Sequence, residues 1–579
     1  MVLPTNLNRF GGGKRKPYYC EVVYLESTGT QYIDTGLSSS AGFKGKATLI
    51  ILENTTAILF GTQLIEGSTQ PNRSMLFTNS GKIKLGCSSD QYTGPSFSVN
   101  TKYAVDFSTE SSYYLNVDGT SSVSGTNTDE RSTGNIYVFC GTQAGQIGYF
   151  SKMRLYYFKM YFGDTLVRDF IPVLDWNMVP CLYDKVSNKL FYNQGTGTFA
   201  YGREIHYVEY LESTGTQYID FGVYGNKNTG IEIEAQATGT PEIGYRLFGC
   251  RTSSSEKACF ISTNSASDIY MNFYNTSSSS NITCDISKKH NYQMMGKKCY
   301  LDGVLVYTMP LPTYDFTTDN TLVLFGAWNG SNFGTKNWKI WKATLYSGYE
   351  KIIDLRPAVD ENGVGFMFDI LNRSVYLNAG TGAFKYPDVE MEYVVANKNG
   401  YLDAGKKATN LTKIEAEVMV TTQSTTTNRI FGNYNDTTKS FTINCANLGT
   451  NTSRFGSQDV ALNQLKLNVN EKHVVGNSQA GITLDGTTLA TWSDETFETS
   501  GNVALLASTN SATTVPNNIV NGLIGNCYGI KWWENNVLTL DLVPMIHNGT
   551  VCMYDKVGET YFNPVVSSSF TAGKIKEAR

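Results

Sequence analysis

The chain has 579 residues, of which 41% are hydrophobic and 17% charged, so it is too apolar for a disordered protein and long enough for several packed domains. With 47 basic against 51 acidic residues, the formal net charge of -4 argues against broad binding to nucleic acid or to an anionic membrane. No apolar run approaches the roughly 18 residues that a membrane span needs, and we expect no membrane insertion.

The first 17 residues form a basic, glycine-rich segment that is too short to fold alone. The segment contains Arg9, Phe10, Lys14, Arg15 and Lys16. Free arms of this composition are normally mobile until a partner orders them. We therefore expect an N-terminal anchor arm that docks the chain on a larger assembly. Binding of its charges to nucleic acid or to an acidic patch is the alternative, and an acidic chain makes nucleic acid the poorer partner.

The rest of the chain consists of three copies of one unit. The eleven letters YLESTGTQYID at 24–34 return at 210–220, an offset of 186 residues (34 to 220). A diverged copy, YVVANKNGYLD, follows at 393–403, a further 183 residues on (220 to 403). Repeats of this length can each bury a core of their own. We predict an arm at 1–17 and units at 18–203, 204–387 and 388–579, with short links that bring neighbouring units into contact.

Within each unit, the pattern predicts short antiparallel strands. Runs rich in Val, Ile, Thr, Tyr and Phe alternate with clusters of Gly, Asn, Ser and Asp, and no segment holds a helical period for three turns. An Asp-Gly pair follows a β-rich run at 118–119, 302–303 and 485–486, where it predicts a hairpin turn. The fold class is therefore all-β, with one antiparallel β-sandwich per unit.

The eleven cysteines show neither a CxxC pair nor a Cys/His cluster of the kind that zinc requires. Cys140 aligns with Phe325 of the second unit, and Cys181 aligns with Phe366. A position that alternates between Cys and Phe is typical of a buried apolar site. We predict reduced core thiols, which suit a protein made and assembled in a reducing cytoplasm.

The opening motif, the central Asp-Gly hairpin and a closing CLYDKV…YNQGTGTF at 181–199 together resemble a known family. They resemble the laminin-G-like, concanavalin A-like jelly-roll domains of bacteriophage virion proteins and of gut bacterial surface proteins. The resemblance covers nearly the whole chain and weakens in the third unit. It implies three tandem jelly-roll sandwiches whose rim loops or concave face bind glycans.

Catalysis is not expected from the acidic residues or the histidines. Hydrolases of this superfamily carry Glu-x-Asp-x-x-Glu on one strand. The nearest runs here, at 232–236 and 415–419, lack the final glutamate, and alternation of Glu with apolar residues is typical of a strand with one solvated face. The four histidines, at positions 206, 290, 473 and 547, are expected at non-equivalent places of the repeats, which disfavours a shared nucleophilic site.

Two tryptophans beside turn-forming residues are the candidate glycan platforms. Trp176 is flanked by Asp175 and Asn177, and Trp328 is followed by Asn329, both in settings predicted to be turn-like. An exposed indole stacks on a sugar ring while neighbouring Asp and Asn supply directional hydrogen bonds. The alternative is an indole packed between units.

Three aspartates at equivalent positions, Asp34, Asp220 and Asp403, raise the question of a cofactor. No organic cofactor is expected. A superfamily in which calcium is common makes calcium possible at these carboxylates, whereas a turn or strand-end cap explains them more simply.

The resemblance implies a structural and adhesive protein of a bacteriophage particle. The resemblance places it on the outer surface of the virion, as a head fibre, tail fibre or capsid decoration. The expected partners are capsid or tail proteins, host or mucosal glycans, and further copies of the chain in a homo-oligomer. A bacterial cell-surface carbohydrate-binding protein is the alternative, and a glycoside hydrolase is a third reading.

Overall fold

The computed structural model describes most of the chain, with gaps in several loops and at both ends. The described residues are 16–64, 72–143, 146–239, 244–251, 257–265, 267–274, 280–309, 315–329, 332–422, 428–445, 452–461, 465–510, 519–520, 522–566 and 569–577. Every regular element in these ranges is a β-strand. No helix among them could cross a membrane. The predicted all-β fold class is confirmed.

The first unit contains two main sheets. The larger one holds β1 (Cys20–Val22), β2 (Leu25–Thr28), β4 (Lys44–Ile51), β9 (Lys102–Ser108), β10 (Ser112–Val117), β11 (Thr120–Thr126), β15 (Lys152–Phe162), β16 (Thr165–Leu174), β17 (Pro180–Asp184), β18 (Lys189–Phe191) and β19 (Ala200–Tyr201). The second holds β3 (Ile33–Ser38), β5 (Ala57–Leu64), β6 (Asn72–Asn79), β7 (Lys82–Ser88), β8 (Asp90–Ser96) and β12 (Asn135–Val138), beside the small hairpin β13 (Gly141–Gln143) and β14 (Gln146–Gly148).

The second unit repeats this plan. One sheet holds β20 (Glu204–Tyr207), β21 (Leu211–Glu212), β23 (Thr229–Ala237), β28 (His290–Met295), β29 (Lys298–Leu301), β30 (Val304–Thr308), β34 (Trp338–Ser347), β35 (Glu350–Val359), β36 (Gly365–Asp369) and β37 (Ser374–Tyr376). The other holds β22 (Ile219–Asn226), β24 (Arg246–Arg251), β25 (Ala258–Ser265), β26 (Asp268–Tyr274), β27 (Ser280–Thr283), β31 (Thr317–Leu324), β32 (Gly326–Asn329) and β33 (Asn332–Thr335).

The third unit is built in the same way despite its divergent sequence. One sheet holds β38 (Val389–Glu390), β39 (Val394–Ala396), β41 (Thr412–Val420), β46 (Lys472–Ser478), β47 (Gly481–Leu484), β48 (Thr487–Ala490), β52 (Gly525–Glu534), β53 (Val537–His547), β54 (Thr550–Asp555), β55 (Thr560–Phe562) and β56 (Phe570–Ala572). The other holds β40 (Leu402–Asp403), β42 (Asn428–Asn433), β43 (Ser440–Cys445), β44 (Thr452–Gly456), β45 (Gln458–Ala461), β49 (Ala504–Leu505), β50 (Ser508–Thr509) and β51 (Ile519–Val520).

Alternating burial along the strands explains why the sheets pair. In β23, Ile231, Ile233 and Ala235 are buried, while Glu232 and Glu234 between them are half-exposed. Side chains of a strand point to opposite faces in turn, so each such strand offers one apolar face to the core. The named pairings are antiparallel except β24 with β32 and β42 with β50.

The Asp-Gly pairs form the predicted hairpins. They connect β10 to β11, β29 to β30 and β47 to β48. Asp118 and Gly119 have φ of 50° and 75°, and the pairs at 302–303 and 485–486 are equivalent. Two successive positive φ values define the turn that matches the twist of a hairpin, and glycine reaches this region without strain.

The first two units share a sheet across the link between them. Strand β1 pairs with β16 of its own unit on one side and with β20 on the other, and β20 in turn pairs with β35. An apolar cluster that includes Ile50 and Tyr156 from the first unit and Phe366 and Phe368 from the second covers this connection. The expected contact between these neighbours is present, while the exact boundaries of the units stay a prediction.

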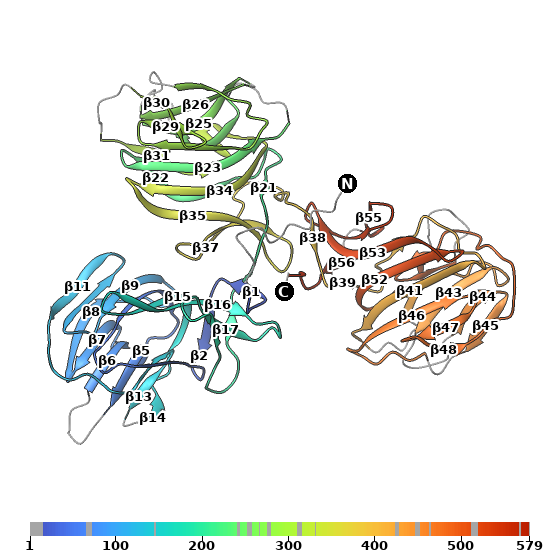
Figure 1. Cartoon of the computed structure of the whole chain (residues 1–579), viewed down its shortest axis with the longest axis horizontal. Coiled ribbons are helices and arrows are strands. Elements are labelled where there is room, and N and C mark those ends of the chain that lie inside the picture. Colours follow the sequence, from blue (N-terminus) through green and yellow to red (C-terminus); the bar gives the residue numbers. More distant parts are fainter. Residues whose placement is uncertain are drawn as a thin grey trace.

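The third unit contacts the region around β1 through the C-terminal segment of the described chain. The Tyr19 hydroxyl donates to the carbonyl of Ile575, and Ile575 forms a bridge with Met391. In Figure 1 the C-terminal end lies between the three groups of strands, close to β1, β38 and β56. We call the region around Tyr19, Glu204, His206 and residues 575–577 the junction.

Candidate functional site

The YLESTGTQYID motif near the start of the first unit forms hydrogen bonds with residues near the end of that unit. Gln31 Oε1 accepts from the backbone N–H of Thr28 at 2.8 Å, and Gln31 Nε2 donates to the carbonyl of Thr196 at 3.2 Å. Asn193 Oδ1 accepts from the N–H of Tyr32 at 3.1 Å. In the second unit, Gln217 Oε1 accepts from the N–H of Thr214, and Asn378 Oδ1 accepts from the N–H of Tyr218. These polar residues are therefore occupied by their own unit, which gives the motif a folding role.

The three repeated aspartates cap turns. Each Oδ1 accepts at 2.8 Å from the backbone N–H of a glycine two residues on, and those glycines have φ between 65° and 68°. Asp34 also accepts from Asn135 Nδ2, and Asp403 accepts from Asn502 Nδ2. The geometry is that of an Asx-turn. It supports the cap interpretation of Asp34, Asp220 and Asp403 over the calcium one.

Trp176 lies in the predicted turn, and that turn forms part of the junction. Its indole is half-buried, donates from Nε1 to the carbonyl of Lys16 at 3.3 Å, and packs edge-on against Tyr19 with ring centroids 5.8 Å apart. Asp175 is buried, and its carboxylate accepts from the backbone N–H groups of Asn177 and Val179. The Asp175 carboxylate therefore shapes the turn, and the indole packs between segments.

Trp328 lies within a strand, so the turn-like setting expected for it is wrong. Strand β32 pairs with β33 on one side, and Trp328 is opposite Cys250 of the parallel strand β24 on the other. The indole is half-buried against the core, and Asn329 ends the same strand. The sequence Trp-Asn-Gly resembles a turn, but Trp328 and Asn329 both belong to the strand. Glycan binding by Trp176 and Trp328 stays a prediction.

The arm is described only at its last residues. Arg9, Phe10, Lys14 and Arg15 lie outside the described residues. Lys16 Nζ lies 3.9 Å from Glu577 Oε2, which places the base of the arm beside the end of the chain.

The carboxylate runs considered for hydrolysis are engaged with basic side chains. Glu232 accepts from Lys342, Asn291 and Tyr346 at 2.9 to 3.0 Å. Burial would raise the pKa of Glu232, but these hydrogen bonds outweigh it and hold the pKa below its usual value. Glu415 and Glu417 form ion pairs with Lys413 and Lys472.

Two histidines occupy equivalent positions, contrary to the expectation. His290 Nδ1 lies 2.8 Å from Asp302 Oδ2, and His473 Nδ1 lies 2.7 Å from Asp485 Oδ2. Each aspartate belongs to an Asp-Gly hairpin and also accepts a backbone N–H at 2.8 Å. The pairs therefore brace a turn in the second and third units.

One group of described residues could hold a metal ion. Cys20, Glu204 and His206 are buried, and one ligand atom from each lies within 4.8 Å of the others. The sequence interpretation missed it because Cys20 and His206 are far apart in the chain and form no recognised spacing. The available signal was the pair Glu204 and His206, two residues apart at the start of a strand.

Comparisons with known proteins identify no family for this chain. No protein-family model and no curated protein matches it. Among solved structures, the LG1-3 region of the laminin α2 chain is 10% identical with a TM-score of 0.26, covering 95% of this chain and all of that one. Mouse laminin α1 domains LG4-5 are 11% identical with a TM-score of 0.22, covering 59% of this chain and 93% of that one. The NanB sialidase from Streptococcus pneumoniae is 9% identical with a TM-score of 0.20, covering 91% and 98%. Likenesses this weak carry no argument about function.

Proposed function

We propose that this chain is a non-enzymatic display protein of a bacteriophage particle, held by its N-terminal arm and presenting β-sandwich units to host or mucosal glycans. The observation that carries the proposal is the meeting of the arm base, the C-terminal segment and the start of the second unit at one junction. Because the base of the arm lies at the junction, attaching the arm to the particle would attach all three units through one site. Capsid and tail are equivalent mounts in this respect.

Polar contacts between the first two units support a scaffold role. Arg373 of the second unit forms an ion pair with Glu21 of the first at 2.6 Å, and Lys102 of the first donates to Ser374 at 2.8 Å. Strand β1 adds backbone hydrogen bonds to both units. A protein that displays binding surfaces benefits from such fixed geometry, because pre-organisation lowers the entropy lost on multivalent binding.

Deletion of residues 1–15 tests the anchor. The deletion stops before Lys16 and so keeps every described contact of the junction. We expect the shortened chain to melt like the full chain but to be absent from purified particles, as measured by mass spectrometry. Incorporation at the normal level would overturn the anchor role.

A glycan panel tests the display role and separates it from its rivals. Retention of the full chain on immobilised polysaccharides, without release of reducing ends, is the expected result. Release of reducing ends would identify a hydrolase instead. Retention by a chain that is found on bacterial surfaces and never in particles would favour the cell-surface lectin.

A further inference from the structure

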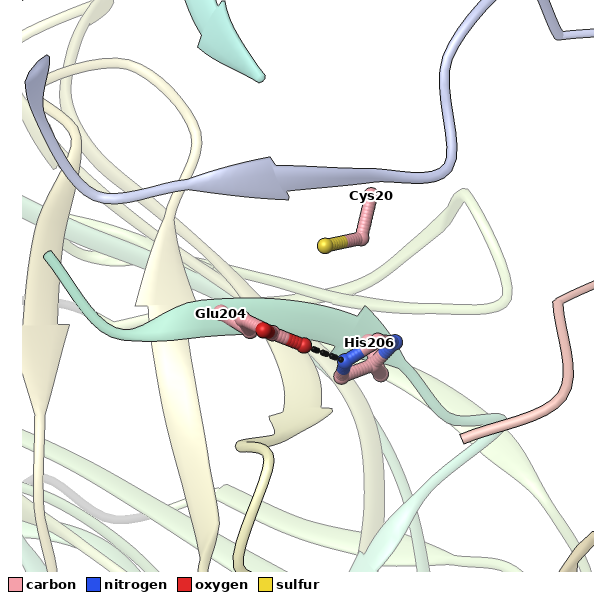
Figure 2. A group of neighbouring side chains, drawn as sticks. All are labelled: Cys20, Glu204 and His206. Atoms are coloured by element: carbon pink, nitrogen blue, oxygen red, sulfur yellow. Dashed lines mark hydrogen bonds and ion pairs between the residues drawn. The ribbon is translucent and has the colours of Figure 1, made fainter. Parts of the chain in front are cut away.

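The alternating geometry of two paired strands brings a thiol, a carboxylate and an imidazole together. Strand β1 pairs antiparallel with β20 so that Glu21 is opposite Ile205 and Val22 is opposite Glu204. The same register sets Cys20 opposite His206. Because side chains two apart share a face of a strand, Glu204 and His206 point to the same side as Cys20. Figure 2 shows the Cys20 thiol on one strand directed toward these two side chains on the other.

His206 is held from both sides by carboxylates. Its Nε2 lies 2.9 Å from Glu204 Oε2, and its Nδ1 lies 2.8 Å from Glu577 Oε1. A neutral imidazole has only one N–H, so both contacts are hydrogen bonds only if both nitrogens are protonated. The side chain is 2% exposed, which makes a charged imidazole costly unless its partners compensate it.

A metal ion bound to Nε2 would satisfy the same side chains while the imidazole carries only one proton, on Nδ1. In metal sites, a ligating histidine almost always donates its other ring N–H to a carboxylate or a carbonyl. Here that carboxylate is Glu577, which contacts Nδ1, the ring nitrogen that does not face Glu204. With a cation on Nε2, the imidazole is neutral, Nδ1–H donates to Glu577, and Glu204 binds the cation instead of a proton.

We propose that Cys20, Glu204 and His206 bind a divalent transition-metal cation of the zinc class, through Sγ, a carboxylate oxygen and Nε2, with Glu577 orienting the imidazole. Thiolate and imidazole select zinc over calcium or magnesium, which prefer oxygen ligands. Binding displaces the proton of the Cys20 thiol and the Nε2 proton of His206 to solvent. Three protein ligands leave one tetrahedral position for a water molecule.

The proposed ion joins parts of the chain that are distant in sequence. Cys20 belongs to the first unit, Glu204 and His206 lie at the start of the second, and Glu577 lies near the end of the third. Because the cation binds the assembled junction and not the separated strands, it stabilises the contact between units. This inference is independent of glycan binding and of the identity of the particle.

Cobalt spectroscopy on the full chain tests the site. The metal-stripped protein is titrated with Co²⁺, both when folded and during refolding, because a buried site can be closed to added metal. We expect one cobalt per chain, a thiolate-to-cobalt charge-transfer band, and displacement by Zn²⁺ but not by Ca²⁺. The absence of the charge-transfer band in both titrations would overturn the proposal without any variant.

Matched substitutions assign the ligands. Cys20→Ser is expected to abolish the charge-transfer band, whereas Cys140→Ser, which alters another buried thiol of the first unit, should retain it. Glu577→Ala should keep the band but weaken binding about 10- to 100-fold, as expected for a positioning residue. If Cys20→Ser keeps the band, or if Cys140→Ser loses it, Cys20 is not the ligand.

Discussion

Arg373 of the second unit reaches into the first and places Nη1 2.6 Å from Oε2 of Glu21. Its Nη2 donates to the carbonyl of Val22 at 2.7 Å. The Arg373 side chain is 3% exposed and that of Glu21 13%, so the pair is withdrawn from water. Burial would raise the pKa of Glu21, but the guanidinium outweighs it and holds the pKa below its usual value.

Removal of the guanidinium is expected to destabilise the contact between the first two units. Loss of one partner from a buried ion pair leaves an uncompensated charge and typically costs about 3 to 5 kcal/mol. Arg373→Ala should therefore lower the free energy of unfolding by this order in a urea melt. Arg154→Ala, which breaks a more exposed Arg–Glu pair with Glu26 inside the first unit, is the control and should cost no more than about 1 kcal/mol. Equal effects of the two changes would contradict the role of Arg373.

Acid is expected to weaken the second unit through Glu232. The folded-state pKa of Glu232 lies below the value of 4.5 for a free side chain, because its hydrogen bonds outweigh burial. Its contribution is therefore complete above the unfolded pKa and is lost as the pH falls through the folded pKa. Glu232→Gln should be less stable than the native chain at neutral pH, and the difference should shrink in acid. Urea melts across this range measure it.

Glu234→Gln is the control for that change. Glu234 lies on the same strand and face but forms a more exposed pair with Lys289. We expect a smaller loss of stability from Glu234→Gln than from Glu232→Gln at neutral pH. A difference between Glu232→Gln and the native chain that stays constant or grows in acid would contradict the proposed contribution of Glu232.

Substitution of Trp176 is expected to lower the stability of the fold, independently of any role in ligand binding. Its ring packs on Tyr19 and its Nε1 donates to Lys16. Trp176→Phe keeps an aromatic ring but loses the donor, so it should cost about 0.5 to 1.5 kcal/mol, and Trp176→Ala should cost more because the ring contact is also lost. A chemical melt measures both. Unchanged stability in Trp176→Ala, together with lost glycan retention, would favour a binding platform.

Apart from Cys20, the proposed metal ligand, the thiols are expected to be inert in the folded chain. Every cysteine is free and buried, and burial raises the pKa of Cys181 to about 12. The thiolate is the reactive form, so labelling should require denaturant, and reductant should leave the melting temperature unchanged. A fall in melting temperature on reduction would show that disulfides stabilise the chain.

The sequence predicted the all-β fold class and its hairpins because the signals for them are local. Asp-Gly after a β-rich run forms a hairpin at all three positions where it occurs in this chain, and Glu alternates with Ile in β23, a half-solvated strand. The setting of Trp328 was predicted wrongly because Asn-Gly is typical of a turn, whereas Trp328 and Asn329 both pair within β32.

The junction could not be predicted in the same way. The contacts of His206 with Glu577 and of Tyr19 with Ile575 join residues more than 370 positions apart. No periodicity or spacing encodes such contacts, because they depend on how complete units pack. The equivalence of His290 and His473 was within reach, since both precede an Asp-Gly pair by the same number of residues, but it was missed.

The double pairing of β1 also determines how the molecule transmits force. A pull on the arm enters the chain just before Cys20 and runs along a strand that is hydrogen-bonded to β16 on one side and to β20 on the other. Bonds perpendicular to the pull are loaded together, in shear, and cannot open one at a time from an end. If the arm is the point of attachment, as proposed above, a force on it is shared between the first two units through the two pairings of β1.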